Sequence, residues 1–219
     1  MELDLSVVWS AWPIILSGLL TTLKCTFFSV LLGFIWGTVL ALIKISKIKP
    51  LEWFSQFYTS VFRGTPLLVQ LSIVYFAFPQ LFGITFTALQ AGVFTLTLNS
   101  AAYISEIFRG GISAIDKGQY EAAMALGVGY KDTMFDIVLP QAVRHILPSL
   151  VNEGIALLKE SSLLAYVGVM DLLRAAEQIT VMTFRYFEPY LVVACIYYIL
   201  VLVLSMFATK LERRLHNSD

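Results

Sequence analysis

Charged side chains are scarce in this chain: they make up 14% of 219 residues, whereas hydrophobic residues make up 58%. The mean hydropathy of +0.78 is typical of an integral membrane protein and argues against a soluble globule. The formal net charge is zero, so nothing indicates binding to nucleic acid. The two cysteines, Cys25 and Cys195, lie in separate apolar stretches. We interpret them as packing residues rather than as parts of a disulfide framework.

Several sequence motifs of enzymes are missing. The dipeptide Gly-Lys does not occur, so the chain has no P-loop with which to bind ATP. His-Glu-x-x-His and Gly-x-Ser-x-Gly are also absent, and His145 and His216 have no partners at metal-ligand spacing. We therefore expect a protein that is not an enzyme and that binds no metal or cofactor of its own. Because Glu2 and Asp4 stand where a secretory signal carries basic residues, no cleaved signal peptide is expected.

Long apolar stretches are abundant instead. A membrane-spanning helix needs about 20 mostly apolar residues. Five stretches are predicted to cross a membrane, at about residues 13–43, 66–82, 88–108, 146–168 and 189–209. Pro79 and Gly83 divide the second from the third. The sequence thus predicts one all-α integral membrane domain over 1–219, with a short amphipathic helix over 50–62 at the membrane interface.

The basic residues predict the orientation of these spans, because cytoplasmic connections carry an excess of Lys and Arg. Of the 15 basic residues, 11 fall in segments that five spans would place on one side: Lys44, Lys47, Lys49, Arg63, Arg109, Lys117, Lys131, Arg144, Lys210, Arg213 and Arg214. The opposite side has no basic excess. We therefore expect the N-terminus outside the cell, the C-terminus in the cytoplasm, and a large cytoplasmic loop over about 110–145.

The predicted cytoplasmic loop contains a spaced motif. Glu121-Ala122-Ala123 is followed after three residues by Gly127 and, after nine more, by Ile137-Val138-Leu139-Pro140. Residues 120–126 favour a helix, which Gly127 can end in the left-handed conformation. A second short helix around 130–135 is expected to run to Leu139-Pro140. The small alanine side chains would let a partner surface approach the backbone closely.

This motif resembles the EAA loop of the permease subunits of ABC importers. Four segments, at 62–70, 102–112, 139–142 and 158–163, resemble the polar amino acid uptake permeases within that group. The similarity covers about residues 15–210. At Glu160 and Ser161 the family more often has Asp and Thr, and both differences retain the chemistry of the side chain.

The resemblance implies a five-span permease of the type I ABC importer fold, forming half of an ATP-driven uptake pore in the bacterial cytoplasmic membrane. A second permease subunit, identical or related, would complete the pore within the lipid bilayer. Two ATPase subunits, which bind ATP and Mg²⁺, would dock on the loop at Glu121, Ala122, Ala123, Gly127, Leu139 and Pro140. An extracellular amino-acid-binding protein would deliver the substrate.

Ionisable residues within the predicted fourth span are candidates for a substrate site, because charges inside a membrane are costly. Glu153 and Glu160 share one helix face, roughly 10 Å apart along the axis, and Asn152 and Lys159 form the adjacent stripe. The three charges sum to −1, which would suit a basic amino acid such as arginine, lysine or histidine. Lys159 would hold the α-carboxylate, and the two glutamates would attract the amino group and the cationic side chain.

Five more residues are candidates for the same cavity or its mouth: Asn99, Tyr103, Ser72, Phe76 and Asp171. An aromatic face at Phe76 would suit a guanidinium, and Asp171 would guard the outer mouth. For all of these except Asp171, ordinary packing is the simpler interpretation. Three alternatives stay open: the charges of the fourth span are structural ion pairs, the pore has no substrate site and an external receptor alone selects, or Glu153 and Glu160 couple protons in a secondary transporter.

Overall fold

The computed structural model describes residues 4, 6–46 and 48–216, and these residues form helices and no strand. The helices are α1 (Ser6–Ser10), α2 (Trp12–Ile45), α3 (Lys49–Gly64), α4 (Leu67–Ser72), the π-helical η1 (Ile73–Ala77), α5 (Phe78–Phe82), α6 (Ala88–Ser113), α7 (Lys117–Ala125), α8 (Tyr130–Asp132), the π-helical η2 (Thr133–Val138), α9 (Leu139–Glu160), the 3₁₀-helical η3 (Ser161–Val167), α10 (Leu172–Thr183) and α11 (Phe187–His216). The predicted all-α class is confirmed for this part of the chain.

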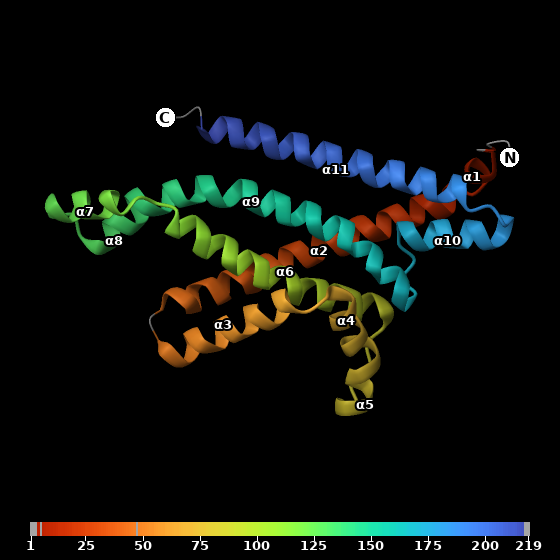
Figure 1. Cartoon of the computed structure of the whole chain (residues 1–219), viewed down its shortest axis with the longest axis horizontal. Coiled ribbons are helices and arrows are strands. Elements are labelled where there is room, and N and C mark those ends of the chain that lie inside the picture. The colour runs from red at the N-terminus through yellow and green to blue at the C-terminus, as the bar shows by residue number, and fades with distance from the viewer. Residues whose placement is uncertain (1–3, 5, 47, 217–219) are drawn as a thin grey trace.

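Four long helices, α2, α6, α9 and α11, run along the long axis of the molecule (Figure 1). α2 packs extensively against α6, and α9 packs against both α6 and α11. α7 and α8 lie at one end of this bundle, and α10 lies at the other end near the N-terminus (Figure 1). α4, η1 and α5 leave the bundle sideways and form an arm, residues 67–82 (Figure 1).

Glycines allow α2 to lie directly against α6. A Cβ atom on Gly37 would be 2.9 Å from the carbonyl oxygen of Ala101 and 2.9 Å from the Cβ atom of Ile104. A Cβ atom on Gly33 would be 3.0 Å from that of Ser100. Such distances are shorter than ordinary contacts between heavy atoms. The four-residue spacing of the two glycines predicts a close approach of this kind, and the structure confirms it.

Replacing Gly37 by alanine is expected to cost about 1–3 kcal/mol of stability, as at other overpacked sites, because the new Cβ atom pushes α2 away from α6. Gly110→Ala is the matched control. Gly110 also lies within α6, and nothing lies within 4 Å of the position of its missing Cβ atom. Alanine there should keep or raise the stability, because alanine favours helices more than glycine does. Thermal unfolding of both purified variants checks this, and equal unfolding temperatures would contradict it.

Two of the described helices, α2 and α11, are each long and apolar enough to cross a membrane. The pair Lys49–Gly64 and Leu67–Phe82, bent by 104°, adds a third span if it counts as one. The predicted count of five is therefore not confirmed by length and hydropathy. α6 contains the predicted third span, whereas the predicted fourth span is divided between α9, which ends at Glu160, and η3. Both α6 and α9 are more polar than α2, and α6 buries Thr95, Asn99, Ser100 and Ser105. Because α2 packs against α6 and α11 against α9, these polar helices are partly covered by apolar ones.

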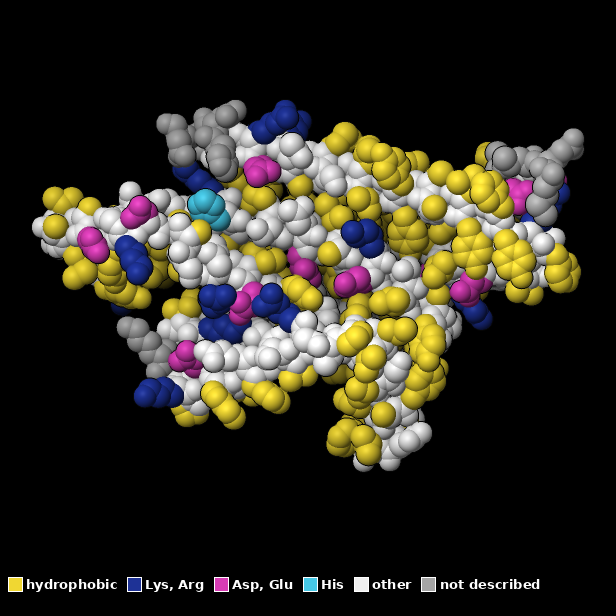
Figure 2. Space-filling view, in the orientation of Figure 1, with side chains coloured by type: hydrophobic (Ala, Val, Ile, Leu, Met, Phe, Trp, Pro, Cys, Tyr) yellow, Lys and Arg dark blue, Asp and Glu magenta, His cyan; other side chains and the backbone are white. Residues whose placement is uncertain are grey.

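Large apolar side chains are exposed along the outer helices. Phe27 and Phe28 on α2 and Ile199 and Phe207 on α11 are exposed. Hydrophobic side chains also cover much of α11 and of the arm (Figure 2). Exposed apolar surface of this extent marks contact with lipid or with another protein. These faces are consistent with a protein embedded in a membrane.

The helices of the predicted cytoplasmic loop are largely confirmed. α7 covers most of the predicted helix at 120–126, and Gly127 follows it at a φ of +75°, in the left-handed conformation. The second helix starts at Tyr130, as the predicted range does. It runs through η2 to Leu139-Pro140, as expected, and there it continues directly into α9. The amphipathic segment at 50–62 forms α3.

Sequence analysis does not predict α10, which lies after the predicted fourth span. Two signals indicate it. Asp171 precedes the helix and caps it by accepting a hydrogen bond from the backbone nitrogen of Arg174, 2.9 Å away. Leu172, Ala176 and Ile179 recur at helical spacing, and all three are buried in the core with residues of α1, α2 and α11.

Candidate functional site

The predicted ATPase-coupling residues lie at the end of the molecule formed by α7 and α8 and at the start of α9 (Figure 1). Four of the six are exposed: Glu121, Ala122, Gly127 and Pro140. Ala123 is buried, and Leu139 is half-buried. The carbonyl oxygen of Ala123 accepts a hydrogen bond from the backbone nitrogen of Val128, 3.0 Å away, which folds the chain after Gly127 back onto α7.

Four large apolar side chains at the same end of the molecule are exposed but do not belong to the predicted coupling residues. Met124, Leu126, Tyr130 and Phe135 are exposed, and Leu126 is the most accessible of them at 84%. We call these four residues the tip cluster. The ring of Tyr130 packs edge-on against that of Tyr120, with 6.0 Å between centroids. Exposed apolar residues grouped in this way are typical of a surface that docks against a partner protein.

Glu153, Lys159 and Glu160, in the second half of α9, have no ion-pair partner among the described residues. Glu153 and Glu160 are half-buried, and Asn152 and Lys159 are exposed. Glu153 lies near the hydroxyl of Ser100 on α6 and close enough to Glu160 for their charges to repel. The two glutamates, which we call the acid pair, therefore form a site that would attract a cation.

Asn99 connects α6 to the bend between α3 and α4. This buried side chain donates hydrogen bonds to the carbonyl oxygen of Phe62 (3.2 Å) and to Oε1 of Gln70 (3.1 Å). Gln70, which sequence analysis does not single out, donates to the same carbonyl oxygen (2.8 Å) and to that of Thr65 (3.1 Å). The bend thus has its free carbonyl groups satisfied by side chains. The amide nitrogen of Asn99 is therefore used inside the protein.

The arm contributes one aromatic residue near the continuation of α9. Phe76 is exposed and packs edge-to-face against Tyr166, with 6.2 Å between ring centroids. Tyr166 lies in η3, six residues beyond Glu160, and is not among the predicted site residues. Ser72 is half-buried, and its hydroxyl donates to the carbonyl oxygen of Leu68 at 2.8 Å. Phe76 and Tyr166 therefore offer aromatic faces to a ligand, whereas the Ser72 hydroxyl already has a partner.

Asp171 is completely buried. One carboxylate oxygen caps α10, and the other has no hydrogen-bond partner among the described residues. Burial raises the pKa of Asp171 to about 6. The neighbouring backbone nitrogen of Leu172 donates to Thr22 on α2 at 3.1 Å. Asp171 therefore lies at the junction of α2 and α10 rather than at an open mouth.

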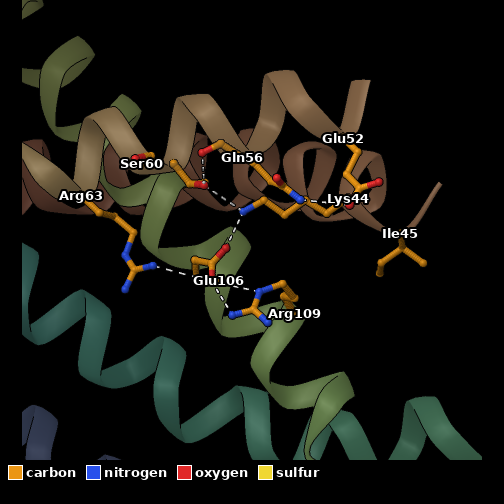
Figure 3. A pocket seen from close by; sticks show the side chains of 9 residues that line it. Lys44, Ile45, Glu52, Gln56, Ser60, Arg63, Glu106 and Arg109 are labelled. Carbon is orange, nitrogen blue, oxygen red and sulfur yellow. Dashed lines mark hydrogen bonds and ion pairs between the residues drawn. The ribbon is translucent and has the colours of Figure 1, made fainter. Parts of the chain in front are cut away.

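A charged cluster that sequence analysis does not predict surrounds Glu106 (Figure 3). One carboxylate oxygen lies 2.6 Å from Nζ of Lys44, and the other lies 2.7 Å from Arg109 and 3.6 Å from Arg63. Lys44, whose side chain is 5% exposed, also donates to the hydroxyl of Ser105 at 3.0 Å. The sequence indicates only one member of this cluster, because Glu106 is an acid within the predicted third span.

This cluster lines a groove with a volume of about 460 Å³ between the end of α2, α3 and α6. Gln56 and Ser60 on α3 line it as well (Figure 3). At its edge, the guanidinium carbon of Arg63 lies 5.4 Å from the ring centroid of Tyr103, a cation–π geometry. Tyr103, a predicted substrate residue, thus contacts the Glu106 cluster.

Sequence comparison connects the chain to transport proteins over nearly its whole length. Residues 29–217 match the family described as "Binding-protein-dependent transport system inner membrane component". The chain is 50% identical over 219 residues to the "Arginine transport system permease protein ArtQ" of Bacillus subtilis (strain 168), covering 100% of both chains. It is also 50% identical over 201 residues to the "Putative glutamine transport system permease protein GlnP" of Rickettsia bellii (strain RML369-C), covering 92% of each.

Solved structures agree with these relatives. The chain superposes on a chain from the "Crystal structure of an amino acid ABC transporter with histidines" with a TM-score of 0.94 and 44% identity, covering 98% of this chain and 100% of that one. An inward-facing MetNI methionine ABC transporter gives a TM-score of 0.75 at 21% identity, covering 97% and 99%, which shows the same fold. The fold is that of an ABC importer permease, and this family transports rather than catalyses. The chain therefore belongs to the family of binding-protein-dependent transport system inner membrane components, as an amino acid ABC transporter permease.

Proposed function

We propose that this permease carries basic amino acids into the cell as the transmembrane subunit of an ATP-driven importer. The observation that carries the choice of substrate is the acid pair, which is half-buried on α9 and has no ion-pair partner among the described residues. Together with Lys159 the pair has a net charge of −1, so a substrate of charge +1 would neutralise it. An acidic amino acid would add a like charge and be repelled. A relative named for arginine and a related structure with histidines support this choice.

The geometry of α9 suggests how the substrate is held. Lys159 binds the α-carboxylate, and Asn152 adds a hydrogen bond from the same stripe. The acid pair takes the α-amino group and the cationic side chain. Phe76 and Tyr166 offer aromatic faces to a guanidinium or imidazolium group. We leave Asn99, Ser72 and Asp171 out of these contacts, because they are buried or already hydrogen-bonded.

The tip cluster and the exposed coupling residues support a proposal for the assembly. Two ATPase subunits, which hold ATP and Mg²⁺, dock where α7 and α8 meet. A second permease subunit, identical or related, completes the pore, and an extracellular binding protein supplies the amino acid. In this arrangement the permease crosses the bacterial cytoplasmic membrane five times, with the N-terminus outside and the C-terminus in the cytoplasm. The excess of basic residues on the loop side supports this orientation.

Glu160→Gln tests the substrate site. Loss of one charge-assisted contact is worth about 1.5–3 kcal/mol, so the apparent affinity for arginine should fall roughly 10- to 100-fold. The measurement is uptake of labelled arginine by vesicles that contain the assembled transporter and internal ATP. Glu212→Gln removes an exposed acid near the end of α11 and should leave the affinity unchanged.

The same vesicles separate the two remaining alternatives. Unchanged uptake and unchanged substrate-stimulated ATPase activity in Glu160→Gln would indicate a pore without a substrate site, with selection by the external receptor alone. Uptake that survives removal of ATP but stops when the proton gradient is collapsed would indicate a secondary transporter. The carboxylates of the acid pair would then carry protons rather than substrate.

A further inference from the structure

The groove around Glu106 holds more positive charge than its carboxylates neutralise. Lys44, Arg63 and Arg109 face Glu106, and Glu52 also lines the groove, which leaves a net charge of +1. The three cations are not held equally. Lys44 and Arg109 lie within 2.7 Å of a Glu106 oxygen, whereas Arg63 is 3.6 Å away and its side chain is 45% exposed. Arg63 is therefore the cation of this groove that is free to bind an anion.

The groove faces an aqueous space rather than lipid. Its α3 side is polar over three turns, because Glu52, Gln56, Ser60 and Arg63 recur at helical spacing. The exposed aromatic side chains of α3, such as Trp53 and Phe57, lie on a different side of the helix. In a membrane protein, polar stripes line cavities or interfaces, and apolar stripes meet lipid. The volume of about 460 Å³ lies within the range of about 300–1,000 Å³ that small-molecule sites occupy.

A winding stripe of residues on α6 extends from the acid pair to this groove. Ser100 of α6 lies near Glu153. Tyr103 is about one turn further along α6, and its ring contacts the guanidinium of Arg63. Glu106 is about one turn further still. Residues three apart are neighbours on a helix surface, so Ser100, Tyr103 and Glu106 form a stripe that winds partly around α6 and extends over roughly 9 Å along its axis. A molecule that leaves the acid pair along α6 towards α7 therefore reaches Arg63 next.

We propose that Arg63 forms a second binding site in this groove, which takes the α-carboxylate of the transported amino acid at the end of the pathway nearest α7. The proposal rests on the proposed transport function but uses different residues from the acid pair. The guanidinium fork of arginine binds a carboxylate through two parallel hydrogen bonds. Arg63 makes these bonds by giving up its long contact with Glu106 and keeping its place beside Tyr103.

The charges of the two sites have opposite consequences for the choice of ligand. The acid pair attracts the cationic groups of a basic amino acid, whereas the groove attracts its carboxylate and repels a ligand that carries positive charge alone. The groove therefore favours an amino acid over the corresponding amine. Agmatine, which is arginine without its carboxylate, should bind at the acid pair and not at the groove.

Equilibrium dialysis of labelled arginine against the purified, nucleotide-free permease–ATPase complex tests this, at concentrations up to the millimolar range. We expect two bound arginines per permease chain. Arg63→Gln should weaken one of them at least 10-fold, and excess agmatine should displace only the other. Arg63→Lys should retain part of the affinity, because it keeps the charge but loses the fork. Lys131→Gln, an exposed lysine on α8, is the control, and thermal unfolding establishes that each variant is folded.

The outcomes separate the two proposals. Glu160→Gln should weaken the agmatine-sensitive arginine and leave the other unchanged. Equal binding by Arg63→Gln and the unsubstituted protein would overturn the second site without affecting the acid pair. A second site that binds inorganic phosphate or phosphatidylglycerol but not arginine would also overturn it. Unchanged binding in Glu160→Gln would instead contradict the proposed substrate site.

Discussion

Replacing Glu106 by alanine is expected to lower the free energy of unfolding of the permease by about 3 kcal/mol. The substitution leaves Lys44, whose side chain is 5% exposed, without its carboxylate partner. The cost lies at the lower end of that for breaking a buried ion pair, because the hydroxyl groups of Ser105 and Thr59 still accept hydrogen bonds from the lysine. Unfolding of the purified protein in detergent, followed by tryptophan fluorescence, measures the change.

Two further variants identify the cause. Replacing Lys44 and Glu106 together by methionine should restore much of the stability, because apolar residues can substitute for a buried ion pair but not for half of one. Glu177→Ala breaks the more exposed pair between Arg174 and Glu177 and should cost less than about 1 kcal/mol. If Glu106→Ala and Glu177→Ala cost the same, the Glu106 cluster does not stabilise the junction of α2, α3 and α6.

Changing Leu126 and Met124 together to glutamate is expected to abolish ATP-driven uptake. Both side chains belong to the tip cluster, and Leu126 is 84% exposed. If they dock in an apolar groove of the ATPase, burying two carboxylates there has a large free-energy cost. Loss of such central interface residues weakens binding by about 2–4 kcal/mol, or roughly 30- to 1,000-fold. Co-purification of the ATPase with the permease, and uptake by reconstituted vesicles, measure the effect.

The control for this prediction lies at the opposite end of the molecule. Met182→Glu also introduces a charge at an exposed methionine, but on α10. It should leave ATPase binding intact. Because the changed side chains of the tip cluster are exposed, the double variant should fold as well as the unsubstituted permease. Normal co-purification of the ATPase with the double variant would contradict docking at the tip cluster.

Much of the fold can be predicted from apolar length and from local signals. The apolar helix α2 is longer than a span needs to be, and Gly127 follows α7 in the conformation that its missing side chain allows. The break between α3 and α4 is harder to predict. Its 104° bend depends on hydrogen bonds from Gln70 and Asn99, and residues 70 and 99 are far apart in the sequence. Only the packed structure shows that these two amides share one set of partners.

The candidate site also has one part that the sequence predicts and one part that it does not. Glu153, Lys159 and Glu160 are found from the sequence, because charges within an apolar stretch on one helix are visible there. The Glu106 cluster is not found, because its members come from α2, α3 and α6 and their relation is set by helix packing. In the sequence, Lys44, Arg63 and Arg109 contribute only to the excess of basic residues that predicts the cytoplasmic side. Their distances to one carboxylate give them a chemical role that a count of charges does not contain.

The arm of residues 67–82 affects the steady-state abundance of this protein in the cell. Its outer residues Leu81 and Phe82 are exposed, so its own bundle leaves this apolar surface uncovered. We propose that the second permease subunit covers this surface in the pore, which makes the final step of folding bimolecular. A subunit made in excess would retain the exposed surface that quality-control proteases recognise. The abundance of the permease should therefore follow the supply of its partner as closely as it follows its own rate of synthesis.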